Sequence, residues 1–289
     1  MVSYLFSLLL AATQPVSVTA PCTSVAGADR LFDQYDLRWL IVGEIHGTAE
    51  IPASFGDLVC AAAKQNRMIT VGVEYPTEDQ SYIDAFLASD GGLGAREKLL
   101  ARPFWRFNDG RSSEAAFLLL ERLRKMKREG MIASVFAFQP RVDRNLRSAE
   151  YEEEMSKIVR RASKGRTLAI ILVGNIHAGL TVRTSSDGDS YMPMAGFLPR
   201  ANTKTLFAAG NGGAAWNCVM ERDSNTTPVC GAHSLGEPPK SYPRGIVLIE
   251  EATNPYNGYF NIGSSLTSSP PAIERAKNSV YPDEPLRRF

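Results

Sequence analysis

This sequence of 289 residues lacks the features that mark several whole classes of protein. Its 32 basic and 31 acidic residues leave a formal charge of +1, so no global field draws it to nucleic acid or to an anionic membrane. It shows no internal repeat or heptad array, and its 44% of apolar residues argues against disorder. These absences leave a globular protein whose binding depends on a local site.

Histidine and cysteine are scarce, which restricts the chemistry open to the chain. Its three histidines are His46, His177 and His233, and its four cysteines are Cys22, Cys60, Cys218 and Cys230. No CxxC motif or Cys/His cluster is present, and the glycine-rich stretch 210–213 lacks the Lys-Ser/Thr of a phosphate-binding loop. Neither a cysteine-ligated metal site nor such a loop is expected.

The even number of cysteines favours an oxidising compartment, because all four thiols can pair. Three connectivities are possible. Cys218 and Cys230 bracket a polar, turn-rich segment, so a disulfide between them would stabilise a loop by roughly 2–4 kcal/mol. That pairing leaves Cys22 with Cys60, although Cys60 also reads as a small buried hydrophobe within the apolar stretch 58–63.

The N-terminal apolar run, residues 4–12, suits a signal-peptide core and is too short for a bilayer span of about 20 residues. Ala20 offers a small residue for cleavage, although Pro21 follows it and no Lys or Arg precedes the run. A buried N-terminal helix is the alternative. We predict a signal peptide over 1–20, a secreted or periplasmic location, and one domain over 21–289 without a transmembrane span.

Apolar runs alternate with amphipathic segments as far as His177. The runs predict strands over 39–43, 68–74, 132–138 and 167–173, and the amphipathic segments predict helices over 51–63, from 77 onward, 112–128 and 144–162. Strands that are apolar throughout are covered on both faces. The sequence therefore predicts a three-layer α/β fold around a central, mostly parallel sheet.

The pattern becomes irregular after His177. Short strands are predicted over 205–209, 216–220, 245–250 and 259–262, joined by loops rich in glycine, proline and serine, with a hairpin turn at 187–189. The segment 264–269 is expected to be poorly ordered.

Polar motifs follow three of the predicted parallel strands. They are Gly43-Glu44-Ile45-His46-Gly47-Thr48-Ala49-Glu50, Glu74-Tyr75-Pro76 and Gly174-Asn175-Ile176-His177-Ala178. Ligands of open parallel sheets bind at the carboxyl ends of the strands, so we expect these motifs to converge. Imidazole acts as a base, nucleophile or metal ligand near neutral pH, and Glu44, Glu50 and Glu74 are suited to orient or charge-stabilise it.

These motifs resemble the superfamily that contains erythromycin esterases, ChaN-like haem-binding uptake proteins and Tiki/TraB metalloproteases. The resemblance rests on Gly43-Glu44-x-His46-Gly47-Thr48-x-Glu50, on Glu74 and on Gly174-Asn175-x-His177-Ala178. It extends from about residue 40 to residue 178 and includes the stretch Asp109-Gly110-Arg111.

Each branch of the superfamily implies a different use of the same cleft. Resemblance to the esterases implies metal-free hydrolysis, with His46 as general base, Glu44 and Glu74 positioning it, and His177 completing the cleft. Resemblance to the Tiki branch implies a divalent metal held by His46, His177 and Glu44 or Glu74. Resemblance to the ChaN branch, whose second motif is the more similar, implies haem ligated by histidine or tyrosine.

The leading functional prediction is an exported hydrolase of esters or amides, with or without a metal. Its predicted catalytic residues are His46, Glu44, Glu74 and His177, and its predicted ligand-binding residues are Glu50, Arg111 and Asn175. The alternative is a haem- or metal-binding uptake protein without turnover, and a third reading is an envelope interaction module with a decayed site. The expected ligand is a small molecule or peptide, not nucleic acid, while cofactor, oligomeric state and the role of His233 stay open.

Overall fold

The computed structural model describes residues 22–65, 67–141, 146–165, 167–185, 188–219, 228–237, 241–249, 251 and 253–273. The predicted signal peptide at 1–20 and the turn-rich segment 221–227 lie outside the described residues.

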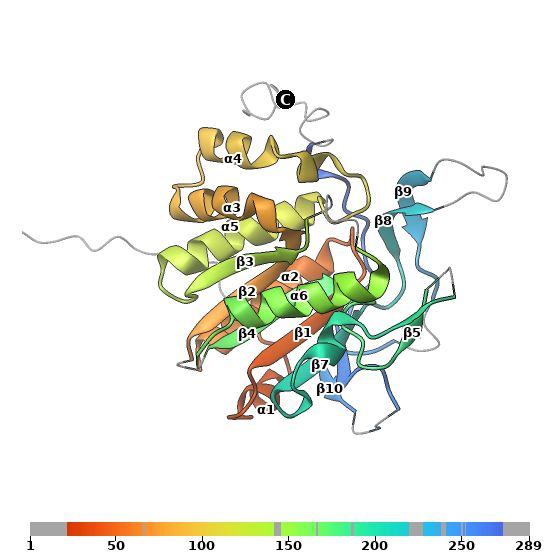
Figure 1. Cartoon of the computed structure of the whole chain (residues 1–289). Helices are drawn as coiled ribbons and strands as arrows, with labels where there is room; N and C mark the ends of the chain where they lie inside the picture. The colour runs from red at the N-terminus through yellow and green to blue at the C-terminus, as the bar shows by residue number, and fades with distance from the viewer. Residues whose placement is uncertain are drawn as a thin grey trace, which may run out of the picture.

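A seven-stranded sheet forms the centre of the fold (Figure 1). In spatial order its strands are β10 (Gly245–Leu248), β11 (Gly258–Asn261), β7 (Thr203–Ala209), β1 (Trp39–Glu44), β4 (Leu168–Gly174), β2 (Ile69–Pro76) and β3 (Ser134–Gln139). Every neighbouring pair is parallel except β10 with β11. The predicted α/β fold with a mostly parallel central sheet is confirmed, and the two-sided burial of β1, β2 and β4 is its physical cause.

Helices cover both faces of this sheet. One face carries α2 (Glu50–Ala63), α3 (Gln80–Ala88), α4 (Leu93–Leu100) and α5 (Glu114–Arg128), whereas α6 (Ser148–Ala162) lies across the other (Figure 1). Successive residues of β1 contribute to two separate cores: Leu40 packs in the core under α2, α3 and α5, and Ile41 packs in the core under α6. Among the described residues, no helix has the length and apolar character needed to cross a membrane.

Shorter elements complete the chain. They are α1 (Ala28–Phe32), the 3₁₀ turns η1 (Thr77–Asp79), η2 (Pro103–Arg106), η4 (Met194–Phe197) and η5 (Arg200–Asn202), and the hairpins β5–β6 (Arg183–Thr184, Ser190–Tyr191) and β8–β9 (Ala214–Val219, Val229–Ser234). Both predicted disulfides are present, Cys218–Cys230 across β8 and β9 and Cys22–Cys60 between the N-terminal segment and α2.

One local prediction is confirmed and another is wrong. The helix expected from Thr77 onward is present as the 3₁₀ turn η1 followed directly by α3. The segment expected to be poorly ordered, 264–269, is instead tied to the fold, because Thr267 O accepts a hydrogen bond from Ala49 N at 2.9 Å and Leu266 forms a bridge with Gly213. Its serine content described local freedom and carried no information about these distant backbone partners.

Candidate functional site

The site lies where three adjacent strands end. β4 lies between β1 and β2 in the sheet, and its last residue, Gly174, is level with Glu44, the last residue of β1. Glu74 lies near the end of β2, on the other side of β4. Because the carboxyl ends of parallel strands share one edge, the motifs that are far apart in the sequence converge there.

Because Gly174 has no side chain, it leaves space for the side chains that converge at this edge. A Cβ atom at this position would lie 2.8 Å from His46 Nε2 and 3.4 Å from Glu74 Oε2. Instead of a side chain, the residue contributes its backbone: Gly174 N donates a hydrogen bond to Glu74 Oε2 at 2.6 Å. The middle strand must therefore end in glycine for the cluster to form.

The first histidine is held by the strand that it follows. His46 Nδ1 lies 2.9 Å from Glu44 Oε1, and His46 Nε2 lies 3.5 Å from Glu74 Oε2. The chain then turns at Gly47, whose φ of 74° is in the left-handed region and whose missing side chain lets the carbonyl of Trp216 approach. The imidazole is thus fixed between two carboxylates at the end of β1.

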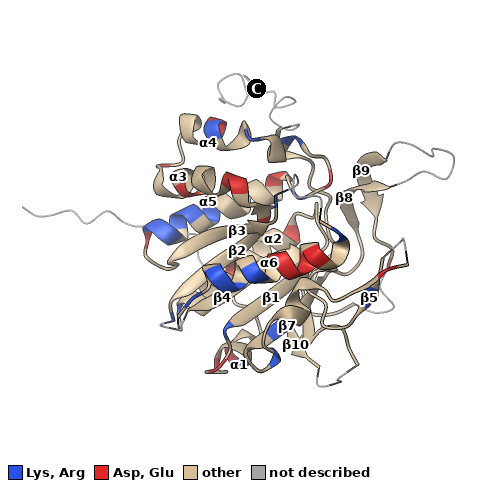
Figure 2. Ribbon diagram, in the orientation of Figure 1, with Lys and Arg blue, Asp and Glu red and all other residues tan. Residues whose placement is uncertain are grey.

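The second histidine is held by a helix. His177 Nδ1 lies 2.6 Å from Glu152 Oε1, and His177 Nε2 lies 3.8 Å from Glu74 Oε1. Glu152 is only 3% exposed, and its other oxygen accepts a hydrogen bond from Met194 N at 2.7 Å. It belongs to the acidic N-terminal half of α6, which Figure 2 shows in red and which suits the positive end of the helix dipole.

A guanidinium completes the cluster. Arg111 Nη1 lies 3.8 Å from Glu74 Oε1, and Arg111 Nε donates a hydrogen bond to Asp109 Oδ2 at 2.9 Å. Asp109 and Arg111 come from the loop between η2 and α5. Glu74 is therefore the common neighbour of two imidazoles and one guanidinium.

This arrangement determines the charge of each group. Burial opposes ionisation of Glu74, but the positive charge and hydrogen bond of His46, with His177 and Arg111, lower the pKa of Glu74 to about 2. Burial likewise opposes charge on His46, yet attraction to Glu74 and the hydrogen bond to Glu44 raise the pKa of His46 to about 10. For His177, burial is outweighed by Glu152 and Glu74, which raise its pKa. At neutral pH the centre therefore holds an ionised Glu74 beside a protonated His46.

The cluster opens into a cavity of about 380 Å³, which lies in the lower part of the usual range for small-molecule sites. Besides Glu44, His46, Glu74, Gly174 and His177, its walls include Ile45, Asp109, Arg111, Asn175, Ile176 and Asn217. The site thus offers polar groups at its base and two isoleucines at its sides.

Most of the residues proposed from the sequence meet in this cavity. His46, Glu44, Glu74 and His177 form its base, and Arg111 and Asn175 line it. Glu50 is not among the lining residues; its Oε2 accepts a hydrogen bond from Thr267 N at 2.8 Å, so it anchors the C-terminal segment.

Sequence reasoning missed Glu152 and Asn217, and it included Asp109 only as part of the stretch Asp109-Gly110-Arg111. For Glu152 a signal was available, because it shares the buried face of α6 with Met155 and Val159 at helical spacing. A carboxylate in the buried stripe of a helix requires a partner, and here that partner is His177.

The donor groups do not fit a divalent metal ion. Within the part of the chain that the structure describes, no three His, Cys, Asp or Glu side chains are arranged to hold a metal ion. All four imidazole nitrogens of His46 and His177 lie 2.6–3.8 Å from a carboxylate oxygen, and Arg111 approaches the remaining side of Glu74. An added cation would have to displace protons and compete with a fixed guanidinium.

No protein-family profile matches the sequence, and no curated protein matches it. Among solved structures, the chain is similar to a variant of the erythromycin esterase EreC in its open conformation, with a TM-score of 0.56 and 11% identity over 84% of this chain and 94% of that one. The type III effector HopBA1 aligns over 85% of this chain and 99% of its own, with 14% identity and a TM-score of 0.44. At this identity the likeness to EreC establishes a shared fold and nothing about activity.

Proposed function

We propose that this protein hydrolyses an ester or amide bond, with His46 as the base that activates water and without a metal. One observation carries the proposal: two imidazoles, each held at Nδ1 by its own carboxylate, converge through Nε2 on a buried Glu74 in a cavity. Both imidazoles are accessible, since the side chains of His46 and His177 are 22% and 20% exposed. The proposed reaction is of the same class as that of EreC, an erythromycin esterase whose fold the chain shares.

The proton positions follow from these contacts. A carboxylate at Nδ1 keeps a proton on that nitrogen, so the neutral form of His46 has its lone pair on Nε2, where it accepts a proton from water. The resulting hydroxide adds to the carbonyl carbon. His177, whose pKa is raised, is suited to return a proton to the leaving oxygen or nitrogen.

Positive charge beside the reacting carbonyl is the third requirement. Arg111 and the His177 imidazole lie on the same side of Glu74, and both are cavity-lining groups. Negative charge that develops on a carbonyl oxygen at this position is stabilised electrostatically in a partly buried setting. The cluster therefore provides a base, an acid and an oxyanion partner from its own side chains.

Since attraction to Glu74 raises the pKa of His46 to about 10, only a small fraction of His46 is neutral at pH 7. Under this proposal the rate increases with pH, about tenfold per unit, until it levels off near the pKa of His46 in the presence of substrate. An alkaline optimum is the signature of this base.

The test measures release of 4-nitrophenol from 4-nitrophenyl acetate and octanoate by the full chain, with and without a chelator. We expect hydrolysis that the chelator does not change and that decreases about 10²–10⁴-fold in His46→Ala. Glu150→Gln, on the exposed face of α6 next to Glu152, is the matched control and is expected to retain wild-type activity. Equal rates in the wild type and His46→Ala, or loss of activity with chelator and recovery with zinc, would refute the proposal.

We also propose that the protein works in an oxidising compartment outside the cytosol. The two disulfides, Cys22–Cys60 and Cys218–Cys230, support this location because such bonds persist where thiols are not kept reduced.

A further inference from the structure

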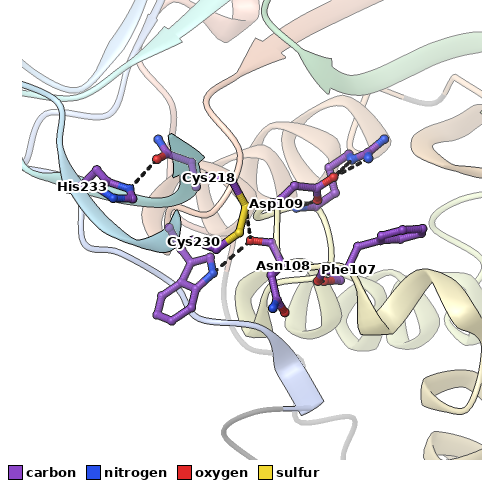
Figure 3. The surroundings of a disulfide bond; sticks show 10 residues. Phe107, Asn108, Asp109, Cys218, Cys230 and His233 are labelled. Carbon is purple, nitrogen blue, oxygen red and sulfur yellow. Dashed lines mark hydrogen bonds and ion pairs between the residues drawn. A yellow bond between two sulfur atoms is a disulfide. The ribbon is translucent and has the colours of Figure 1, made fainter. Parts of the chain in front are cut away.

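The hairpin β8–β9 is anchored to two of the loops that build the site. Trp216 N donates a hydrogen bond to Gly47 O at 2.8 Å, next to His46, and Trp216 Nε1 donates one to Asn108 O at 3.1 Å, next to Asp109. Figure 3 shows the disulfide of the hairpin lying against Asn108, with Asp109 following in the same loop. These hydrogen bonds therefore fix the hairpin as one wall of the site.

Strand register assigns alternate residues of the hairpin to one face. Ala215 is opposite His233, Asn217 is opposite Gly231, and Val219 is opposite Val229. Side chains two residues apart on a strand point to the same side, so these three pairs form a single row. Asn217, in the middle pair, lines the cavity, and the row therefore continues the cavity outward.

The third histidine of the chain orients Asn217. His233 Nδ1 lies 2.7 Å from Asn217 Oδ1, and an N–H donor at that nitrogen occupies the amide oxygen (Figure 3). The amide then presents its NH₂ group, which only donates. A ligand that meets Asn217 in the cavity is consequently one with a hydrogen-bond acceptor.

Space beside this amide is open. A Cβ atom added at Gly231, directly opposite Asn217, would meet nothing within 4 Å. The next pair outward, Val219 and Val229, is apolar and exposed by 38% and 42%. Along this face of the hairpin, the Asn217 amide is thus followed by the open space at Gly231 and then by the apolar side chains of the next pair.

We infer that this face of the hairpin is a substrate subsite for an aliphatic acyl group. Asn217 donates to a carbonyl oxygen, and the attached aliphatic chain crosses Gly231 to lie on Val219 and Val229. The inference rests on the proposed hydrolase function and makes it more specific, because it names aliphatic acyl esters or amides as the substrate class. His233 is a positioning residue that acts through Asn217.

Two ketones that cannot be hydrolysed test the subsite independently of turnover. 2-Decanone carries a carbonyl and a long aliphatic chain, whereas 2-butanone carries the carbonyl with a short one. Their dissociation constants are measured by ligand-observed NMR with the full chain. Each methylene buried is worth about a fourfold change in affinity, so the wild type should bind 2-decanone more than tenfold more tightly than 2-butanone.

Gly231→Val is the main variant, because valine suits a strand and its side chain fills the gap. It should weaken the binding of 2-decanone at least about tenfold and leave the dissociation constant of 2-butanone unchanged. Ala232→Val places a valine on the opposite face of β9 and is the matched control, expected to bind both ketones as the wild type does. Equal binding of 2-decanone by the wild type and Gly231→Val, or no binding by the wild type, would overturn the inference.

Asn217→Ala and His233→Leu test the donor. Each variant should weaken the binding of both ketones. The double variant should bind them no more weakly than Asn217→Ala alone does, since His233 acts only by orienting that amide. Additive effects would contradict the positioning role.

Failure of the subsite and failure of the hydrolase have different signatures. A wild type that binds 2-decanone in the expected pattern but cleaves 4-nitrophenyl octanoate no faster than His46→Ala does would contradict the hydrolase and support the subsite. Cleavage that depends on His46 but is indifferent to Gly231→Val at every chain length would support the hydrolase and contradict the subsite.

Discussion

The two histidine–glutamate pairs have closely similar geometry but are assembled in opposite ways. Glu44 and His46 are two residues apart at the end of one strand, whereas Glu152 precedes His177 by 25 residues and comes from helix α6. One pair is thus a local motif, and the other exists only because α6 packs across the sheet. A local sequence motif and a tertiary contact therefore produce pairs of similar geometry.

Their surroundings also differ. The Glu152 side chain is 4% exposed, and both of its oxygens have partners, His177 and Met194 N. The Glu44 side chain is 11% exposed, and its Oε2 is buried without a hydrogen-bond partner in the described part of the chain. The second pair is consequently more anchored than the first. This difference favours His46 as the base.

The largest effect is expected from Glu74→Gln, which removes the carboxylate that both pairs share. Activity on 4-nitrophenyl esters should decrease about 10²–10⁴-fold. Loss of the largest attractive interaction should also lower the pKa of His46 from about 10, so the alkaline limb of the pH–rate profile should move toward neutral pH. An unchanged midpoint of the alkaline limb of the pH–rate profile would show that the two pairs do not meet at Glu74.

Gly174→Ala is expected to have the next largest effect. Its Cβ would lie 2.8 Å from His46 Nε2, so the imidazole must move and kcat should decrease about 100-fold, as expected when a reacting group is displaced by about 1 Å. Gly94→Ala is the control, because it lies in α4 with nothing within 4 Å and should stabilise the helix by up to about 1 kcal/mol. Wild-type kinetics for Gly174→Ala would exclude this crowding.

Glu44→Gln and Glu152→Gln compare the two pairs directly. We expect Glu152→Gln to lower the free energy of unfolding by about 1–3 kcal/mol, because His177 loses its buried charged partner. Glu44→Gln should cost less stability but decrease kcat more. Chemical denaturation and steady-state kinetics measure both quantities, and the reverse order would contradict the assignment of His46 as base and His177 as the anchored partner.

The smallest effect is the pH dependence of stability. The pKa of His46 is raised from 6.5 to about 10, so its contribution is complete below pH 6.5 and is lost as pH increases toward 10. The pKa of Glu74 is lowered from 4.5 to about 2, so its contribution is complete above pH 4.5 and is lost on acidification toward 2. The melting temperature should therefore be highest between about pH 4.5 and 6.5, and Glu74→Gln should flatten both limbs.

Much of the sheet could be predicted because its strands are apolar throughout. Runs such as 39–43 and 167–173 announce burial on both faces, and the observed β1 and β4 match them within one residue at each end. By contrast, β9 and its exposed residues have no apolar pattern, and the strand depends on the register with β8 and on the disulfide. Hydrophobic periodicity arises from burial, so it does not reveal strands that are not buried.

The sequence by itself determined the parallel α/β core, the local pair of Glu44 and His46, and the placement of Glu74 and His177 at strand ends. Those features depend on neighbours in the chain and on the rule that parallel strands share an edge. Only the tertiary structure decided that Glu152 holds His177, that Glu50 binds the C-terminal segment, and that His233 orients Asn217. Such contacts join residues from different elements, and short-range composition contains no information about which elements will pack together.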